Sequence, residues 1–158
     1  MAHCFGDRER FAVEVGPALG EFRLRVVDLW VAGVELCCDD NQAFVPQFGF
    51  SMEREITRLL SDNDRSLPHL ELSPEENHRR LWAGGDYDPY TFMDWGPTTD
   101  NLLALLFRCG PTAIITVEFC RRSHPRPDEL GRVFVAELPE REVLRALHQA
   151  VCVLRSGA

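Results

Sequence analysis

The chain has 158 residues, a formal net charge of −8 and no lysine, so all 17 of its basic residues are arginine. This length suits one domain, residues 1–158, that buries a single core. No apolar run is long enough to cross a membrane, and Asp7, Arg8, Glu9 and Arg10 stand where a signal peptide needs apolar residues. We therefore expect a cytoplasmic protein without a membrane partner.

The negative charge is concentrated in the middle of the chain. Residues 35–100 carry 14 acidic and 5 basic side chains, which gives this segment a net charge of −9. Such a segment repels phosphate backbones and attracts basic surfaces, so it disfavours nucleic acid as a partner and favours a basic protein. The alternative is that the acidity only aids solubility.

The N-terminal third predicts antiparallel strands joined by short turns. Alternating apolar residues predict a strand over 10–16 that ends at Gly16-Pro17, and the change of apolar parity in the next strand predicts a bulge near Val26-Val27. The other elements expected here are a strand over 22–31, a turn at 32–33, a returning strand over 34–38 and a short edge strand over 44–46.

Two helices are expected next. Ser51 is a suitable N-cap for a helix that ends at the polar run Ser61–Asp64. Ser73, followed by Pro74 and Glu76, forms a capping-box pattern that starts the second helix. This second helix should carry Leu81 and Trp82 inward and end at Gly84-Gly85.

The last third predicts a hairpin, one more strand and a final helix. Leu102–Arg108 and Thr112–Cys120 flank the turn Gly110-Pro111, and their nearly continuous apolar character places both strands at the centre of a sheet. A strand over 132–138 and a helix that begins at Pro139 follow. The order β-β-β-α-α-β-β-β-α indicates an α+β fold with a mostly antiparallel sheet of about six strands and helices on one face.

The segment Trp82–Trp95 stands out as the candidate site. It holds two of the three tryptophans and both tyrosines, and its glycines and proline make it a loop. Tyrosine and tryptophan give large contact areas at interfaces, whereas the alternative is that the large rings fill the edge of the core. We expect Trp82 and Trp95 to anchor the loop. The predicted binding residues are Asp86, Tyr87, Asp88, Tyr90, Asp94 and Trp95.

No residue pattern indicates an enzyme, a metal or a cofactor. Motifs of serine hydrolases, phosphate-binding loops and zinc proteases are absent, and the six cysteines form no CxxC pair. We therefore expect no catalytic residues, no metal ligands and no cofactor. The alternatives left open are a metal held by Cys37 or Cys38 with a distant histidine, and a cysteine nucleophile paired with His78 or His148.

Two segments resemble known families. The run from Phe5-Gly6-Asp7 to Phe11-Ala12-Val13-Glu14 resembles the opening of a family of bacterial polymorphic-toxin immunity proteins. The runs 27–32 and 38–41 are similar to uncharacterised actinobacterial proteins. The first resemblance implies a small cytoplasmic α+β protein, without catalytic residues, that neutralises a toxin by binding it.

The sequence therefore predicts a non-enzymatic binding protein, most simply an immunity protein whose acidic, aromatic surface binds a basic toxin domain. One alternative is a small-molecule or enzymatic site beneath the Trp82–Trp95 loop. The other is a homodimer that pairs through an exposed strand edge.

Overall fold

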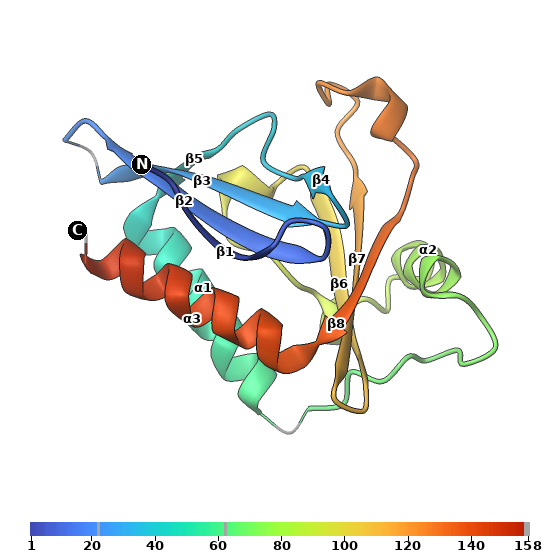
Figure 1. Cartoon of the computed structure of the whole chain (residues 1–158). Helices are drawn as coiled ribbons and strands as arrows, with labels where there is room; N and C mark the ends of the chain where they lie inside the picture. The colour runs from blue at the N-terminus through green and yellow to red at the C-terminus, as the bar shows by residue number, and fades with distance from the viewer. Residues whose placement is uncertain (22, 62, 157–158) are drawn as a thin grey trace.

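A computed structural model describes residues 1–21, 23–61 and 63–156, and within them two antiparallel sheets pack with three helices (Figure 1). The five-stranded sheet has the order β1-β2-β3-β4 with β5 also paired to β3, and the three-stranded sheet has the order β6-β7-β8. The strands of the two sheets are β1 (His3–Asp7), β2 (Phe11–Leu19), β3 (Leu24–Val31), β4 (Val34–Glu35), β5 (Gln42–Phe44), β6 (Leu102–Cys109), β7 (Thr112–Phe119) and β8 (Phe134–Pro139). The helices are α1 (Val45–Leu60), α2 (Pro74–Gly84) and α3 (Glu140–Ser156). The predicted α+β class and antiparallel pairing are confirmed.

A bulge is present between β2 and β3, but its extra residue lies on β2, whereas the sequence predicts it on β3 near Val26-Val27. Val15 pairs with Val27 and Ala18 pairs with Arg25, so the register shifts across Gly16-Pro17. Two residues of β2 thus face one residue of β3, which is the geometry of a bulge. As a result β2 continues to Leu19 instead of ending at Gly16-Pro17. The predicted turn after β3 is confirmed, because Ala32 and Gly33 both have positive φ.

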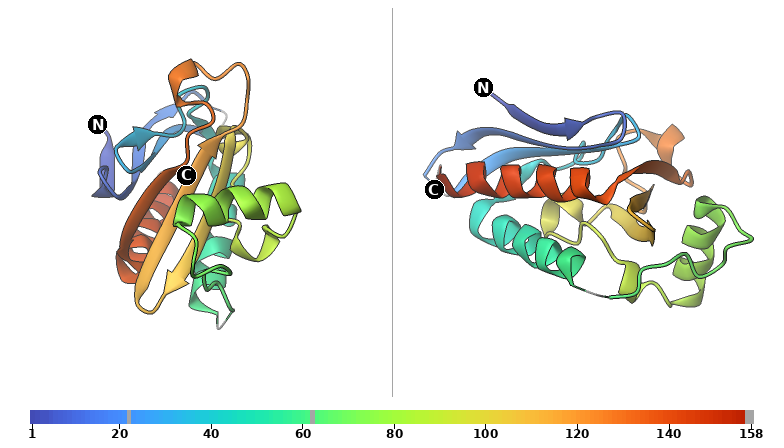
Figure 2. Two further views of the ribbon diagram at one scale, coloured as in Figure 1. Left: turned by 90° about the vertical axis from the view of Figure 1, so that its right-hand side faces the viewer. Right: turned by 60° about the horizontal axis from the view of Figure 1, so that its bottom comes forward.

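The three-stranded sheet is covered on both faces, which explains its nearly continuous apolar sequence. On β7, Ile115 and Val117 point into the main core that is shared with the five-stranded sheet, α1 and α3. Ile114, which precedes them and points to the other face of the strand, contacts a smaller cluster under α2 together with Leu105 and Leu81. Helix α2 therefore lies on the opposite face of this sheet from α1 and α3 (Figure 2).

Helices α1 and α3 pack side by side beneath the five-stranded sheet (Figures 1 and 2). Both are amphipathic, and α3 buries the predicted stripe of Val143, Leu147, Val151 and Leu154. Arg108 on β6 joins these elements: its guanidinium donates to both carboxylate oxygens of Glu140 at 2.8 and 3.0 Å, and to the backbone oxygens of Leu59 and Asn63 near the end of α1. A bidentate arginine–carboxylate pair of this kind fixes geometry as well as charge.

Several predicted boundaries are wrong. Helix α1 begins at Val45, six residues before Ser51, because Pro46 fits a first helical turn and Phe48 packs inward. The edge strand expected over 44–46 lies earlier in the chain, as β5 (Gln42–Phe44), because α1 already begins at Val45.

Other expectations differ in extent. The returning strand expected over 34–38 is shorter, because β4 covers only Val34–Glu35. The strand expected over 132–138 is β8, which begins at Phe134. Strand β1 was not expected. Phe22 and Asp62, which belong to the predicted second strand and the first helix stop, lie outside the described residues. The Ser73 capping box and the left-handed Gly85 that ends α2 are confirmed. No helix in the described residues is long and apolar enough to cross a membrane.

Trp95→Ala is expected to lower the free energy of unfolding by about 3–5 kcal/mol, because its ring is 2% exposed and the substitution leaves a cavity. Trp82 is half-buried rather than fully inward as predicted, so Trp82→Ala should cost only about 1–2 kcal/mol. Urea unfolding of the two variants measures both values. Equal losses would contradict this assignment of the two rings.

His78 gives the fold a pH dependence. Its side chain is fully buried between α2 and β7, and this burial, followed by the nearby Arg79 charge, lowers the pKa of His78 from 6.5 to about 4. Between these two pH values the unfolded chain binds more protons than the folded chain. The titration of His78 therefore costs no stability above pH 6.5. As the pH falls to about 4, it lowers the free energy of unfolding by about 3 kcal/mol in total.

Urea unfolding between pH 7 and pH 4 checks this value when the wild-type chain is compared with His78→Gln. The difference in unfolding free energy between the two should change with pH across this window. A difference that stays constant would show that His78 titrates normally in the folded chain.

Candidate functional site

The second half of the Trp82–Trp95 segment is held in the main core. The Trp95 ring packs edge-on against Phe48 of α1, with ring centroids 5.7 Å apart, and against Phe92 at 5.6 Å. Phe92, Met93 and Trp95 are each at most 2% exposed. The backbone follows β6 here, since Phe92 N–H donates to the carbonyl of Ala104 at 3.0 Å. Trp95 therefore anchors this segment, and its ring is not available on the surface.

The first half of the segment rests on the outer face of the three-stranded sheet. Tyr87 stacks on Trp82 with ring centroids 3.8 Å apart, and Tyr90 packs against Phe107 at 5.2 Å. Both tyrosines are half-buried; Tyr87 directly precedes the short 3-10 helix η1 (Asp88–Tyr90), and Tyr90 is its last residue. Burial, followed by the nearby Asp64 charge, raises the pKa of Tyr90, so its hydroxyl stays protonated at neutral pH. The loop is thus an ordered surface with each ring braced from below.

Three predicted acidic residues of this loop face solvent. Asp86, Asp88 and Asp94 are exposed, and among the described residues none of them forms an ion pair. Some acidic residues elsewhere in the middle segment are paired within the chain: Glu35 pairs with Arg126 at 2.7 Å and Asp39 with Arg121 at 3.4 Å. The three loop carboxylates are therefore available to a partner, as are exposed acidic side chains outside the loop such as Asp64 and Glu75.

A hollow of about 220 Å³ lies between this loop and α1. Sequence reasoning placed the loop residues here but missed the wall that α1 supplies, because that wall depends on tertiary packing. The lining residues are Asp88, Thr91, Asp94 and Trp95 from the loop and Ser51, Arg54, Glu55 and Arg58 from α1. Most are charged or polar, whereas sites for small organic molecules are mostly apolar.

The base of the hollow contains a buried ion pair. Glu55 is 4% exposed and accepts from the guanidinium of Arg65 at 3.1 Å, while Arg58 lies 3.6 Å from its second oxygen. Burial raises the pKa of Glu55 and lowers the pKa of Arg65, and in each case the opposite charge of the partner counters the effect of burial. The pair therefore serves to fix the floor of the hollow, and it leaves the loop carboxylates free.

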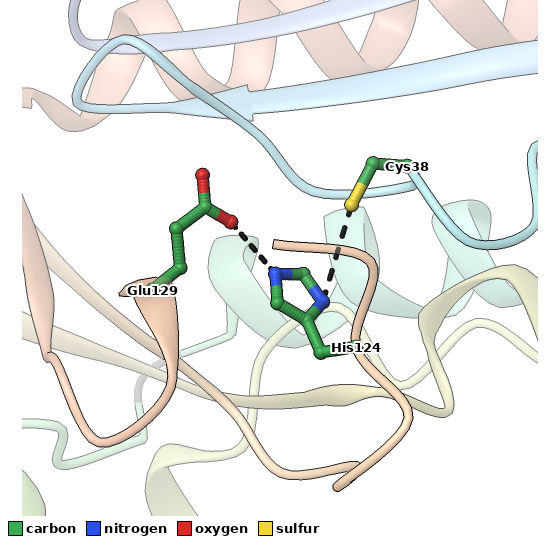
Figure 3. A group of neighbouring side chains, drawn as sticks. All are labelled: Cys38, His124 and Glu129. Carbon is green, nitrogen blue, oxygen red and sulfur yellow. Dashed lines mark hydrogen bonds and ion pairs between the residues drawn. The ribbon is translucent and has the colours of Figure 1, made fainter. Parts of the chain in front are cut away.

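A second cluster of chemically active side chains joins the segment after β4 to the segment after β7 (Figure 3). Nδ1 of His124 lies 4.0 Å from the Cys38 sulfur, and Nε2 lies 2.7 Å from a Glu129 oxygen. The structure thus brings His124 to Cys38, in place of His78 or His148, which the alternative of a cysteine nucleophile left open. His148 is exposed, and His78 contacts Thr116 on β7.

Hydrogen bonds around His124 fix its role. The Asn101 amide oxygen accepts from the backbone N–H of Arg121 at 2.8 Å, so its NH₂ group donates to Nδ1 of His124 at 2.9 Å. Nε2 must then carry the proton and donate to Glu129. Nδ1 is therefore occupied and cannot take a proton from Cys38.

Neither chemistry considered for the cysteines fits this cluster. Burial raises the pKa of the Cys38 thiol, whereas a nucleophile needs a lowered pKa. The three side chains each offer one ligand atom, and these atoms lie within 4.8 Å of one another, but both nitrogens of the His124 ring are engaged in hydrogen bonds, so a metal ion would have to displace the Asn101 or the Glu129 contact. We assign His124 a structural role in holding the two segments together.

Comparison with known proteins gives a relation at the level of fold. No protein-family model matches the sequence, and no curated protein sequence matches it. The structure is similar to that of CdiI from Burkholderia dolosa AUO158, with a TM-score of 0.62 over 95% of this chain and 99% of that chain. The two sequences are 14% identical over this match, so the relation establishes a shared fold.

Proposed function

We propose that this chain is a non-enzymatic immunity protein that binds and neutralises a cognate toxin domain. The observation that carries the proposal is the fold shared with CdiI, a contact-dependent inhibition immunity protein, over nearly the whole length of both chains. The N-terminal resemblance to immunity proteins, seen in a segment that forms β1 and the start of β2, supports the same conclusion independently of the fold.

In this proposal, the toxin binds to the loop surface formed by Asp86, Tyr87, Asp88, Tyr90 and Asp94. Unpaired carboxylates attract a basic partner and raise the rate of association, while braced tyrosines supply contact area with few torsions left to freeze. The partner is therefore a basic protein domain, and neither nucleic acid nor a membrane is required. The chain acts in the cytoplasm, where it meets a toxin that has entered the cell.

Inhibition by binding needs no catalytic group, which agrees with the satisfied hydrogen bonds of His124 and the raised pKa of Cys38. The small-molecule alternative has one observation in its favour, the hollow beside Asp88 and Asp94. Its charged lining and its volume of about 220 Å³ suit a protein side chain better than an apolar ligand.

The direct test uses the toxin domain at the C-terminus of the large secreted protein expected beside this gene. Expression of that domain alone should stop growth, and co-expression with this chain should restore it. Purified domain and chain should form a 1:1 complex in calorimetry. A functional toxin domain that this chain neither binds nor neutralises would overturn the proposal, and so would a neighbouring biosynthetic cluster in place of any toxin gene.

The double variant Asp88→Asn/Asp94→Asn tests the loop surface. Exposed charge pairs are worth roughly 0.2–1 kcal/mol each, so removing two should weaken toxin binding by about 2-fold to 30-fold at low salt. The wild-type chain should bind less tightly as salt rises, and the variant should show a smaller salt dependence. Surface plasmon resonance at several salt concentrations measures both effects.

Glu137→Gln on β8 is the matched control, because it removes one exposed carboxylate on a different element. It should leave affinity and salt dependence nearly unchanged. If the control and the double variant behave alike, the loop surface is not the binding site, and the exposed arginines of the 121–126 segment become the next surface to test.

A further inference from the structure

The hollow between the loop and α1 has walls of opposite charge. The α1 wall carries Arg54 and Arg58, and the loop wall carries Asp88 and Asp94. Among the described residues, neither aspartate forms an ion pair, and the two arginines form none with the loop. The charged groups on both walls are therefore free to hydrogen-bond with a group that enters the hollow.

Contacts on α1 hold its wall in place. The guanidinium of Arg54 lies 5.9 Å from the ring centroid of Phe50, within reach of a cation–π interaction. Arg58 donates to the backbone carbonyl of Thr91 at 3.4 Å and lies 3.6 Å from a carboxylate oxygen of Glu55. Because Arg58 thus joins α1 to the loop, the hollow is formed before a partner arrives.

The opposite charges of the two walls select among the side chains of a partner. A lysine or an arginine would pair with Asp88 and Asp94 but would face Arg54 and Arg58. An aspartate or a glutamate would pair with the arginines but would face the aspartates. An apolar side chain would leave both walls without hydrogen bonds. A primary carboxamide brings no charge, and it has an oxygen that accepts and an NH₂ group that donates.

We propose that this hollow receives the side chain of an asparagine or a glutamine of the bound toxin. The amide oxygen accepts from Arg54 or Arg58, and the amide NH₂ group donates to Asp88 or Asp94. The volume of about 220 Å³ exceeds that of a cavity that holds benzene, roughly 150 Å³, so such a side chain has room. This inference rests on the proposed function and adds a contact that determines specificity, because a basic domain without this amide would be attracted to the loop but bound weakly.

Propionamide tests the chemistry of the hollow on this chain alone. It carries the carboxamide of a glutamine side chain, and propionate and propylammonium are the matched anion and cation. In ¹H–¹⁵N NMR, propionamide should shift the backbone signals of Thr91 and Asp94 along a saturable curve, with a Kd of about 1–100 mM for a ligand of about five heavy atoms. The charged analogues should shift them less. Equal shifts from all three compounds, or no saturable shift from propionamide, would contradict the proposal.

Ser51→Trp fills the hollow from the α1 side and leaves every loop carboxylate in place. It should abolish the propionamide shifts and raise the dissociation constant for the toxin at least about tenfold. Ser156→Trp is the matched control, because it adds the same ring at an exposed position of α3 outside the hollow, and it should bind both ligands as the wild type does. Melting temperatures check that both variants fold, and the titration of the wild-type chain needs neither of them.

Substitutions in the toxin domain separate this inference from the proposed function. Each exposed asparagine or glutamine of that domain is changed in turn to the corresponding acid. One of these changes should raise the dissociation constant at least about tenfold, because its new carboxylate faces Asp88 and Asp94. If the chain neutralises the toxin but Ser51→Trp binds it as tightly as the wild type, the inference fails and the proposed function stands. If the chain does not bind the toxin at all, the proposed function fails and the inference with it, whatever propionamide does.

Discussion

The burial of Trp95 between α1 and the core organises the loop face that we propose as the binding surface. Its edge-on contacts with Phe48 and Phe92 fix the segment between α2 and β6 against the body at one end. The stack of Tyr87 on Trp82 fixes the other end. Between Trp82 and Trp95 the apolar Phe92 and Met93 are buried, whereas Asp86, Asp88 and Asp94 face solvent. An ordered loop loses less conformational entropy on binding than a free one, which favours tight recognition.

The buried carboxylate of Glu55 is paired with an arginine, whereas the three loop carboxylates form no ion pair among the described residues. Glu55 and Arg65 compensate each other in the core, and Glu35 and Asp39 pair with arginines of the 121–126 segment. These pairs close contacts between parts of the chain that are distant in sequence. The loop carboxylates have no such partner among the described residues, and in the proposed function their long-range field steers the approach of a basic protein.

Much of the fold could be predicted because its signals are local. The Ser73–Glu76 capping box and Gly85 are satisfied within a few residues, and the turns at Ala32-Gly33 and Gly110-Pro111 follow from backbone preferences. The predicted start of α1 at Ser51 is wrong because it too relies on a local signal alone. Ser51 is a good cap in isolation, but the burial of Val45 and Phe48 against the core extends the helix backward. Tertiary packing outweighs a cap worth about 1 kcal/mol.

The sequence by itself determined the α+β class, most of the elements, the acidic middle and the aromatic loop, because these depend on composition, periodicity and turn chemistry. Only the tertiary structure decided that the strands form two sheets, that α2 covers the far face, and that His124 meets Cys38. It also decided that α1 borders the loop and exposes Phe50. Contacts between distant segments are set by how whole faces pack, and no local pattern in the chain records that pairing.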